Sequence, residues 1–291
     1  MKNSIIKSTK KSIKNQIFWG RFFIMTLLII ISLLVLLPIY YLVLASFTRM
    51  NHIFADGLTL IPRFDRIGVF NYITMSTARN GIFWSWYFNS LVITMMYTVG
   101  ALFLTSLVGY SLGVYKFKGR NLIFILVLIV MMLPIEILML PLFNLSVRLR
   151  IINTRIGVIL PFLVAGNAVF FFRQFCSGLP LEFMDAGRID GATEYGIFFR
   201  IMVPLMKPAY GAMTILLAMS SWNMFVWPLI VLRSNRNYTL PIGLASLLTP
   251  YGNNYEILLP GAILTIIPVI VVFLFNQKLF VSGLSAGGVK G

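Results

Sequence analysis

The sequence predicts an all-α membrane protein with six transmembrane helices and with both ends in the cytoplasm. Three observations support this class: the composition, the length of the uncharged stretches, and the uneven distribution of the basic residues. Of the 291 residues, 59% are hydrophobic and only 11% are charged, whereas charged residues make up about 25% of an average soluble domain. Such a composition cannot cover a water-exposed surface.

Six stretches of the chain contain almost no charged residue or histidine. Each approaches or exceeds the roughly 20 residues that an α-helix needs to cross the hydrocarbon core of a bilayer. Membrane-spanning β-strands would instead alternate polar and apolar residues over about 10 positions. Buried helices of a soluble protein would leave an amphipathic shell, and none remains here. The predicted spans are residues 22–48, 80–115, 121–147, 156–172, 208–232 and 257–277, of which the fourth is the shortest.

The first span follows a basic segment, residues 1–21, which contains six lysine or arginine residues and no acid. The apolar run after this segment is too long for a signal peptide and has no small-residue cleavage site, so we expect a retained helix. The external loop that follows is the longest, and Asp56-Gly57 and Pro62 mark it as rich in turns. Residues 22–80 therefore form a first region, after a cytoplasmic tail at 1–21.

The second and third spans carry two special features. An aromatic cluster at residues 83–88 is typical of the lipid headgroup boundary. In the third span, Pro134 and Pro141 would interrupt a straight helix. Glu136 lies between them and is the only charged residue predicted inside the membrane, where a lipid-facing carboxylate is costly. It either belongs to a pathway or gate, or it accepts a hydrogen bond that holds helices together.

The orientation follows from the basic residues. If the N-terminus lies inside, cytoplasmic segments hold fifteen lysine and arginine residues and external segments hold nine. This asymmetry favours cytoplasmic N- and C-termini. The net charge of +16 is therefore assigned to membrane topology rather than to nucleic-acid binding, for which the chain has no motif.

One cytoplasmic segment, residues 173–207 between the fourth and fifth spans, is too long and too acidic for a simple connector: it holds four of the eight acidic residues. Pro180 followed by Glu182 predicts a helix start. This amphipathic helix is expected to end at Asp190-Gly191, where glycine permits a sharp bend. A second helical stretch, 193–202, is closed by a proline. The segment therefore predicts a bent helix pair with an exposed apolar knob that suits a cleft in another protein.

Within this segment the chain reads Asp185-Ala186-Gly187-Arg188-Ile189-Asp190-Gly191-Ala192, then eight residues, then Ile201-Met202-Val203-Pro204. This resembles the EAA loop of the permease subunits of binding-protein-dependent ABC importers, whose pattern is Glu-Ala-Ala-x-x-Asp-Gly-Ala, eight residues, and Ile-x-Leu-Pro. The spacing is kept throughout, with departures at Asp185, Gly187 and Val203. Gly187 is the least conservative of these, because glycine inside a helix costs about 1 kcal/mol relative to alanine.

Other patches resemble the carbohydrate-importing branch of this family, similar to the second membrane subunit of the maltose transporter. They are residues 88–91, 133–134 with 141, 152–154 before 160–161, 222–228, and the C-terminal 283–291. The C-terminal patch is especially specific. The similarity implies a type I importer permease fold over residues 81–278, with five helices and a coupling loop at 173–207, and a cytoplasmic C-terminal tail at 279–291. It also implies a bacterial cytoplasmic membrane and a sugar or oligosaccharide substrate.

The resemblance further implies partners. In such importers two permease subunits form the pathway, two ATPase subunits bind beneath them, and an extracytoplasmic solute-binding protein delivers the substrate. The loop would lie in a cleft of the ATPase subunit and transmit its closure to the spans. The residues implied in ATPase coupling are Glu182, Met184, Asp185, Ala186, Gly187, Asp190, Gly191, Ala192 and Pro204, together with Ala286, Gly287, Gly288 and Lys290 of the C-terminal tail.

The chain is not expected to be an enzyme. It has no Gly-x-x-x-x-Gly-Lys-Ser/Thr phosphate loop, so ATP and Mg are expected on a partner subunit and no cofactor is expected here. Cys176 is the only cysteine and His52 the only histidine. They cannot form a disulfide framework or a Cys/His metal site within this chain.

Substrate contacts are less specific in the sequence. Polar or aromatic residues at membrane depth are possible pathway residues, although each of them could instead join helices. An ion-gradient-driven secondary transporter is an alternative, but it should carry several charged groups inside the membrane. An ABC importer permease for a non-sugar solute and a membrane-embedded enzyme are the others, the last without a visible catalytic group. The possible pathway residues are Glu136, Asn167, Ser221, Trp222 and Asn223.

Overall fold

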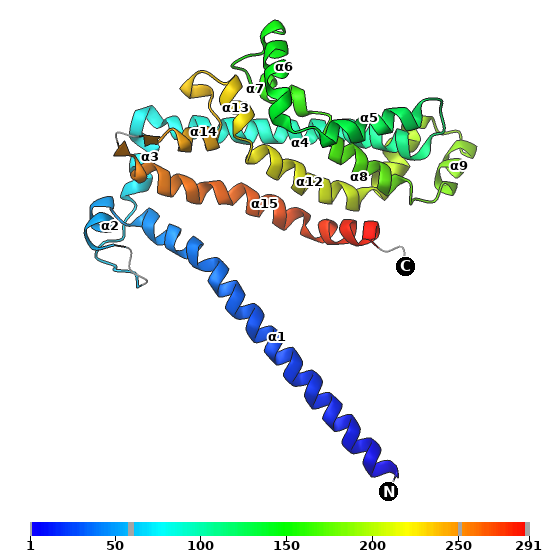
Figure 1. Ribbon diagram of the computed structural model, residues 1–291, viewed down its shortest axis with the longest axis horizontal. Coiled ribbons are helices and arrows are strands. Elements are labelled where there is room, and N and C mark those ends of the chain that lie inside the picture. Colours follow the sequence, from blue (N-terminus) through cyan, green and yellow to red (C-terminus); the bar gives the residue numbers. More distant parts are fainter. Residues whose placement is uncertain (1, 58–60, 250–251, 289–291) are drawn as a thin grey trace. The chain divides into compact units, whose positions relative to one another are not determined.

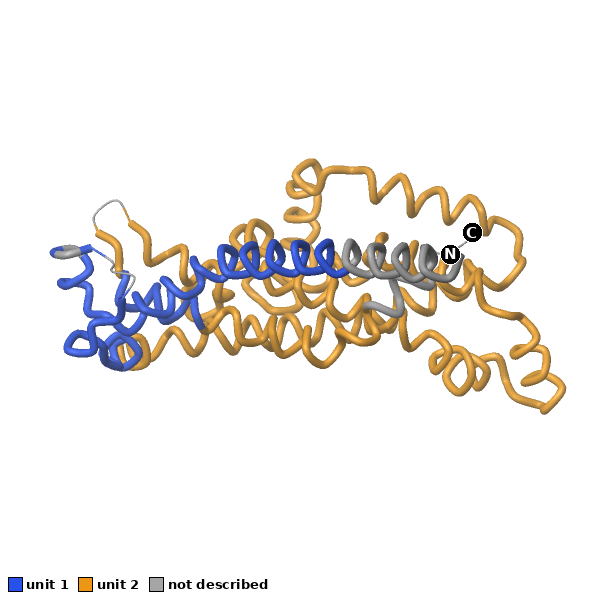
Figure 2. Tube along the Cα trace, turned by 90° about the horizontal axis from the view of Figure 1, so that it is seen from below, with its two compact units in different colours: residues 1–74, 255–263 blue, residues 75–254, 264–291 orange. Residues whose placement is uncertain are grey.

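Helices make up almost the whole of the described chain, which comprises residues 2–57, 61–249 and 252–288 of the computed structural model (Figure 1). The chain divides into two units (Figure 2). One unit comprises Met1–Thr74 and Tyr255–Ile263, and the other comprises Met75–Asn254 and Leu264–Gly291. The last helix, α15 (Tyr255–Gly288), contributes to both units.

The first unit contains α1 (Lys2–Phe47), α2 (Met50–Asp56) and the start of α3 (Phe70–Thr77). The loop between α1 and α3 is held to the end of α1 by Asn71, whose side-chain amide donates to the carbonyls of Ser46 and Thr48, both at 2.9 Å. The apolar part of α1 exposes every side chain from Phe18 to Tyr40. Lipid or a partner must therefore cover it.

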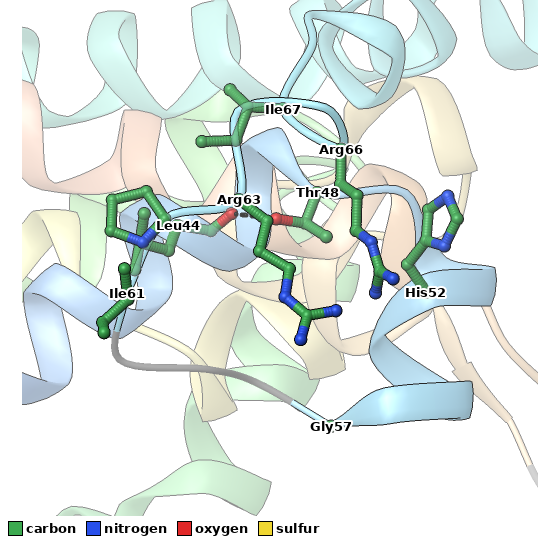
Figure 3. A pocket seen from close by; sticks show the side chains of 9 residues that line it. Leu44, Thr48, His52, Gly57, Ile61, Arg63, Arg66 and Ile67 are labelled. Atoms are coloured by element: carbon green, nitrogen blue, oxygen red, sulfur yellow. Dashed lines mark hydrogen bonds between the residues drawn. The ribbon is translucent and has the colours of Figure 1, made fainter.

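Figure 3 shows a small hollow in this unit, with the side chains of His52, Arg63 and Arg66 around it. Its volume is about 30 Å³. That is room for about one water molecule, so the hollow cannot hold a transported solute.

The second unit is built around one long helix, α4 (Ile82–Val114), which lies beside α8 and α12 (Figure 1). A two-stranded antiparallel hairpin is the only sheet in the described residues. The elements, in chain order, are η1 (Ala78–Gly81), α4, α5 (Arg120–Met132), α6 (Ile135–Arg148), α7 (Arg155–Ile159), η2 (Leu160–Phe162), α8 (Gly166–Cys176), α9 (Glu182–Ile189), α10 (Glu194–Ile197), the π-helix η3 (Phe198–Met202), α11 (Val203–Leu205), α12 (Lys207–Trp222), α13 (Val226–Val231), η4 (Asn235–Asn237), α14 (Leu240–Ala245), β1 (Leu248–Thr249) and β2 (Gly252–Asn253).

Small residues at every fourth position let α4 and α8 pack closely. Ala101, Thr105, Gly109 and Gly113 lie along one side of α4. A Cβ atom at Gly109 would lie 2.5 Å from Cβ of Phe172, and one at Gly113 would lie 2.9 Å from the carbonyl oxygen of residue 173. Small residues at this spacing allow helix backbones to approach inside a membrane.

Three helices in the described residues are each long and apolar enough to cross a bilayer: Phe18–Phe47, Phe70–Val114 and Tyr255–Phe280. Three further segments reach that length only as bent pairs. The pairs are Arg120–Met132 with Ile135–Arg148, bent by 103°; Arg155–Phe162 with Gly166–Cys176, bent by 46°; and Glu194–Leu205 with Lys207–Trp222, bent by 78°. The described chain thus has three to six candidate spans, depending on whether each bent pair counts as one.

The helix breaks agree only in part with those predicted from the sequence. The third apolar stretch breaks at Pro134, as expected, but Pro141 lies inside α6 without ending it. The fifth stretch, 208–232, does not form one helix, because residues 223–225 separate α12 from α13.

The aromatic cluster, which the sequence places at the headgroup boundary, has side chains on two faces of its helix. Trp84 and Phe88 are exposed, whereas Phe83 and Trp86 are buried. Gly243 leaves the space that the Trp86 ring fills, and the Trp86 indole N–H donates to the carbonyl of Asn235 at 2.8 Å. A local partner for the indole N–H removes the need for interfacial water.

Candidate functional site

The bent segment of residues 181–205, here called the elbow, consists of α9, α10, η3 and α11. Two acids, Glu182 and Asp185, lie in the first turn of α9. The positive end of the helix dipole stabilises their negative charges there. Asp190 caps the other end of α9. The helix therefore starts and stops where the sequence predicts.

The bend has the hydrogen bonds of a Schellman motif. The N–H of Gly191 donates to the carbonyl of Arg188 at 3.0 Å, and that of Ala192 donates to the carbonyl of Gly187 at 2.9 Å. Gly191 has φ of +78°, the left-handed conformation that this motif requires. Thr193 then caps α10 by accepting the N–H of Gly196 at 3.1 Å. Only two residues therefore separate the C-cap of one helix from the N-cap of the next.

Gly187, the least conservative departure from the EAA pattern, lies where α9 crosses the second helix of the elbow. A Cβ atom there would lie 2.7 Å from Cδ1 of Ile201 and 3.2 Å from Cγ1 of Ile197. The larger isoleucines thus occupy the volume that an alanine would need at this crossing.

Met184 faces into the protein. It is 2% exposed and belongs to the same buried cluster as Ile197 and Phe198. The hydroxyl of Tyr110 on α4 donates to its sulfur at 3.7 Å. Met184 and Gly187 therefore attach the elbow to the helices, and neither is available to a partner in this conformation.

A charged network, absent from the sequence prediction, joins the two arms of the elbow. Nε of Arg188 donates to Glu194 at 2.8 Å, and Nη1 donates to Asp185 at 3.0 Å. The hydroxyl of Tyr115, just past the end of α4, donates to the same Glu194 carboxylate. The spacing of three residues between Asp185 and Arg188 indicates an ion pair on one face of a helix. No local sequence pattern indicates that Tyr115 joins the network.

The network shifts the ionisation of its members. The hydrogen bond from Arg188, followed by that from Tyr115, lowers the pKa of Glu194. Burial, followed by the hydrogen bond to Glu194, raises the pKa of Tyr115. Glu194 therefore stays ionised and Tyr115 stays protonated at neutral pH, which keeps both bonds intact.

The outer surface of the elbow is apolar at its tip. Ile189 is 86% exposed and Tyr195 is 78% exposed. The other predicted coupling residues of this loop also lie on the outside, namely Glu182, Asp185, Ala186, Asp190, Gly191, Ala192 and Pro204.

The sequence predicts that Pro204 closes the second arm of the elbow, but the structure differs. The arm continues to Leu205 and bends at Met206, and a π-helical turn, η3, precedes the proline. Proline has no N–H to donate to the carbonyl four residues earlier. A wider turn before it accommodates that missing bond.

The predicted C-terminal contact lies only partly within the described chain. Ala286, Gly287 and Gly288 belong to the last turns of α15. Lys290 lies outside the described residues.

Two of the possible pathway residues line one open cleft of about 570 Å³. Glu136 comes from the first turn of α6, and Asn167 comes from the start of α8. Ser220 also lines the cleft, together with the aromatic side chains of Phe162 and Trp227. Carboxylate, amide, hydroxyl and aromatic groups thus face one space, a set that can bind a polyhydroxylated solute.

The other three possible pathway residues lie elsewhere. Ser221 is buried. The indole of Trp222 donates to the carbonyl of Thr265 at 3.1 Å, and the side chain of Asn223 donates to the carbonyl of Met219 in its own helix at 2.9 Å. Their hydrogen bonds are those of helix packing and helix ending.

The family-like patches 88–91 and 152–154 meet at the start of α4, far along this helix from Tyr115. We call this end, residues 86–90, 153–155 and 231–240, the cap. The amide of Asn89 donates to the carbonyls of Arg236 and Tyr238 at 2.8 and 3.1 Å, and its oxygen accepts from Arg155 at 2.8 Å. Asn89 thus joins three segments and uses nearly all of its hydrogen-bonding capacity.

Asn153 has a similar role in the cap. It adopts φ of +59°, and its side-chain oxygen accepts the backbone N–H groups of Arg233 and Ser234 at 3.0 and 3.2 Å. Asparagine tolerates this conformation better than most residues. The patch residues at 153 and 89 therefore hold the cap together rather than contacting a solute.

The comparisons with known proteins agree with this geometry. Residues 105–284 match the family described as "Binding-protein-dependent transport system inner membrane component". The chain is 55% identical to the arabinooligosaccharides transport system permease protein AraQ of Bacillus subtilis, over 90% of this chain and 92% of the relative. It is 36% identical to the lactose transport system permease protein LacG of Rhizobium radiobacter, over 72% and 75% of the two chains.

The fold has a solved counterpart. A chain from the crystal structure of a bacterial ABC transporter involved in the import of the acidic polysaccharide alginate matches with a TM-score of 0.76 and 25% identity, over 87% of this chain and 93% of that chain. The family match covers more than half of the sequence, and the resemblance seen in the EAA-like loop is confirmed. This chain belongs to the binding-protein-dependent transport system inner membrane component family, the permease subunits of ABC importers.

Proposed function

We propose that this permease forms half of the translocation pathway for a sugar or oligosaccharide, spans a bacterial cytoplasmic membrane six times, and is driven by an ATPase subunit that binds the elbow. The names of the relatives support the sugar class, since AraQ and LacG belong to transport systems for arabinooligosaccharides and lactose. The open cleft with Glu136, Asn167 and Trp227 is the observation that carries the pathway assignment.

The elbow supports the assignment of ATPase coupling. Its tip carries exposed apolar side chains at Ile189 and Tyr195, and a stable protein surface rarely leaves such groups uncovered without a partner. Its inner side is attached to α4 through Met184 and Tyr115. A force applied to the tip would therefore reach the longest helix of the unit directly.

The partners follow from this role. A second permease subunit completes the pathway, two ATPase subunits hold ATP and Mg, and an extracytoplasmic binding protein delivers the solute. The residues proposed for the ATPase contact are those on the outside of the elbow, together with the C-terminal residues from Ala286 onward. Met184 and Gly187 act by holding the elbow in place.

The substrate proposal is tested with the complete importer in proteoliposomes. The ATPase rate is measured with the binding protein and a panel of saccharides, including arabinose oligomers, lactose and a non-sugar solute. Stimulation by one class of saccharide is expected. Stimulation by none of the saccharides, but by the non-sugar solute, would contradict the sugar assignment.

The topology is tested by cysteine labelling in intact cells, after replacement of the buried Cys176 by alanine. A membrane-impermeant maleimide should label Arg236→Cys in intact cells. It should label Tyr195→Cys only after permeabilisation. Labelling of both positions from outside would overturn the proposed orientation.

A further inference from the structure

Two arginines converge at the end of the α5–α8 pair without a carboxylate between them. The guanidinium of Arg173 lies over the ring of Phe124, with Cζ 3.6 Å from the ring centroid. Arg120, at the first position of α5, is close enough for the two positive charges to repel. Neither arginine forms an ion pair with any carboxylate in the described part of the chain.

Arg173 also has an unused hydrogen-bond donor. Its Nε atom is buried and has no partner among the described residues. Nη1 of Arg120, by contrast, donates to the carbonyl of Tyr115 at 3.1 Å. A buried charged donor without an acceptor is costly. An anion that accepts from Arg173 and neutralises both arginines would remove that cost.

The surroundings of Arg120 are basic. The turn before α5 lines an open hollow of about 610 Å³ and places Lys116 and Lys118 beside Arg120. The nearby carboxylates of the elbow, Asp185 and Glu194, are already bound to Arg188. This end of the unit therefore has spare positive charge, and arginine binds phosphate through paired N–H groups.

The surface of α5, the helix that begins at Arg120, indicates what kind of phosphate-bearing ligand the site can bind. No residue of α5 is buried. Ile123, one turn after Arg120, is 44% exposed, and Val130 on the same side of α5 is 57% exposed, so an apolar surface begins one turn from the arginines. A ligand with a phosphate group and long apolar chains matches both parts, because the charges meet the headgroup and these aliphatic side chains meet the acyl chains.

We propose that Arg120 and Arg173 bind the phosphate of an anionic phospholipid whose acyl chains lie along α5. The site is separate from the elbow tip and from the cleft at Glu136. Its occupancy can therefore be measured on the purified permease without ATP, substrate or partner subunits, and the result does not depend on the proposed coupling.

The test is native mass spectrometry of the full chain in detergent, delipidated and then titrated with phosphatidylglycerol or phosphatidylcholine. Phosphatidylglycerol should bind more tightly. Arg173→Gln and Arg120→Gln should each weaken that binding about fivefold, as expected for one basic residue at an anionic lipid surface. Arg148→Gln, which removes an exposed arginine at the end of α6, is the matched control and should have no effect.

Two further measurements are made. Arg173→Lys keeps the positive charge, so it should retain most of the binding if Arg173→Gln loses it through loss of charge. The Tm of each variant is measured to detect misfolding. Inorganic phosphate is added to distinguish a lipid headgroup from free phosphate as the ligand, and it should compete only weakly. Equal binding of the two lipids, unchanged binding in both glutamine variants, or displacement of the lipid by equimolar phosphate would each overturn the proposal.

Discussion

The two ends of α4 are attached to their surroundings by different kinds of bond. At the cap, the buried amide of Asn89 and the half-buried amide of Asn153 bind backbone groups of residues 233–238. At the elbow, the attachment is a half-exposed network of Arg188, Glu194 and Tyr115 around a small buried contact at Met184. Buried amide bonds are costly to break, whereas exposed ion pairs contribute little and are screened by salt.

This difference assigns a rigid role to one end and a movable role to the other. In the proposed coupling role the elbow transmits motion to α4 through the buried contact at Met184, and exposed contacts that can break and re-form let it adjust to its partner. The cap, in contrast, holds the segments beside the cleft in one arrangement.

Asn89→Ala should have the largest effect on stability. It leaves the carbonyls of Arg236 and Tyr238 and the guanidinium of Arg155 without their partner. Each unsatisfied buried group costs about 1–3 kcal/mol. We expect a fall of several degrees in the Tm of the detergent-purified chain. Asn223→Ala, which removes a bond to its own helix only, should leave Tm nearly unchanged, and equal effects of the two changes would contradict the rigid cap.

Gly187→Val should disturb the elbow more than the rest of the chain. Its side chain would overlap Ile201 and Ile197, and such overpacking costs about 1–3 kcal/mol. In the reconstituted importer, ATP hydrolysis should continue while solute uptake falls. Gly187→Ala combined with Ile201→Val restores the lost space and should recover uptake. Full uptake by Gly187→Val would show that the crossing is not tightly packed.

Gly191→Val tests the bend itself. A Cβ atom at this position meets nothing within 4 Å, so the cost comes only from φ of +78° and amounts to about 1–2 kcal/mol. Uptake should fall, with insertion unchanged. Gly191→Asn tolerates this conformation and should retain most uptake. Identical uptake by the valine and asparagine variants would exclude backbone strain as the cause.

Glu194→Gln should have the smallest effect on stability, because the pair with Arg188 is exposed. The coupling of hydrolysis to uptake should fall, and adding salt to the unmodified importer should have a similar effect. The pKa of Glu194 is lowered in the fold, so its stabilisation is complete above the unfolded value of about 4.3 and is lost as pH falls through the folded value. The fall in Tm below that pH should therefore be shallower in the Gln variant, and parallel pH profiles would exclude the pair as a source of stability.

The features that local chemistry decides could be predicted from the sequence. Pro134 breaks the third apolar stretch, and Gly191 makes the bend, because each acts through its own backbone. The EAA-like resemblance locates the elbow along the chain. The start and the bend of its first helix can therefore be named from the amino-acid sequence alone.

The features that depend on distant partners could not be predicted. Trp86 is buried because Gly243 leaves room for its ring, and Tyr115 reaches Glu194 only because α4 ends beside the elbow. The family resemblance includes Met184 among the coupling residues, yet its side chain faces Tyr110. The side of a short helix that faces inward is decided by the helices it meets, which spacing alone does not identify.

The proposed coupling is tested most directly by cross-linking at the tip of the elbow. In the complete importer with Cys176 replaced by alanine, Ile189→Cys carries a photoreactive maleimide, and Leu248→Cys serves as an exposed control on the hairpin. We predict a cross-link from position 189 to the ATPase subunit and none from position 248. Cross-links from position 189 to lipid only, with an assembled and active ATPase present, would show that the elbow is not the ATPase contact.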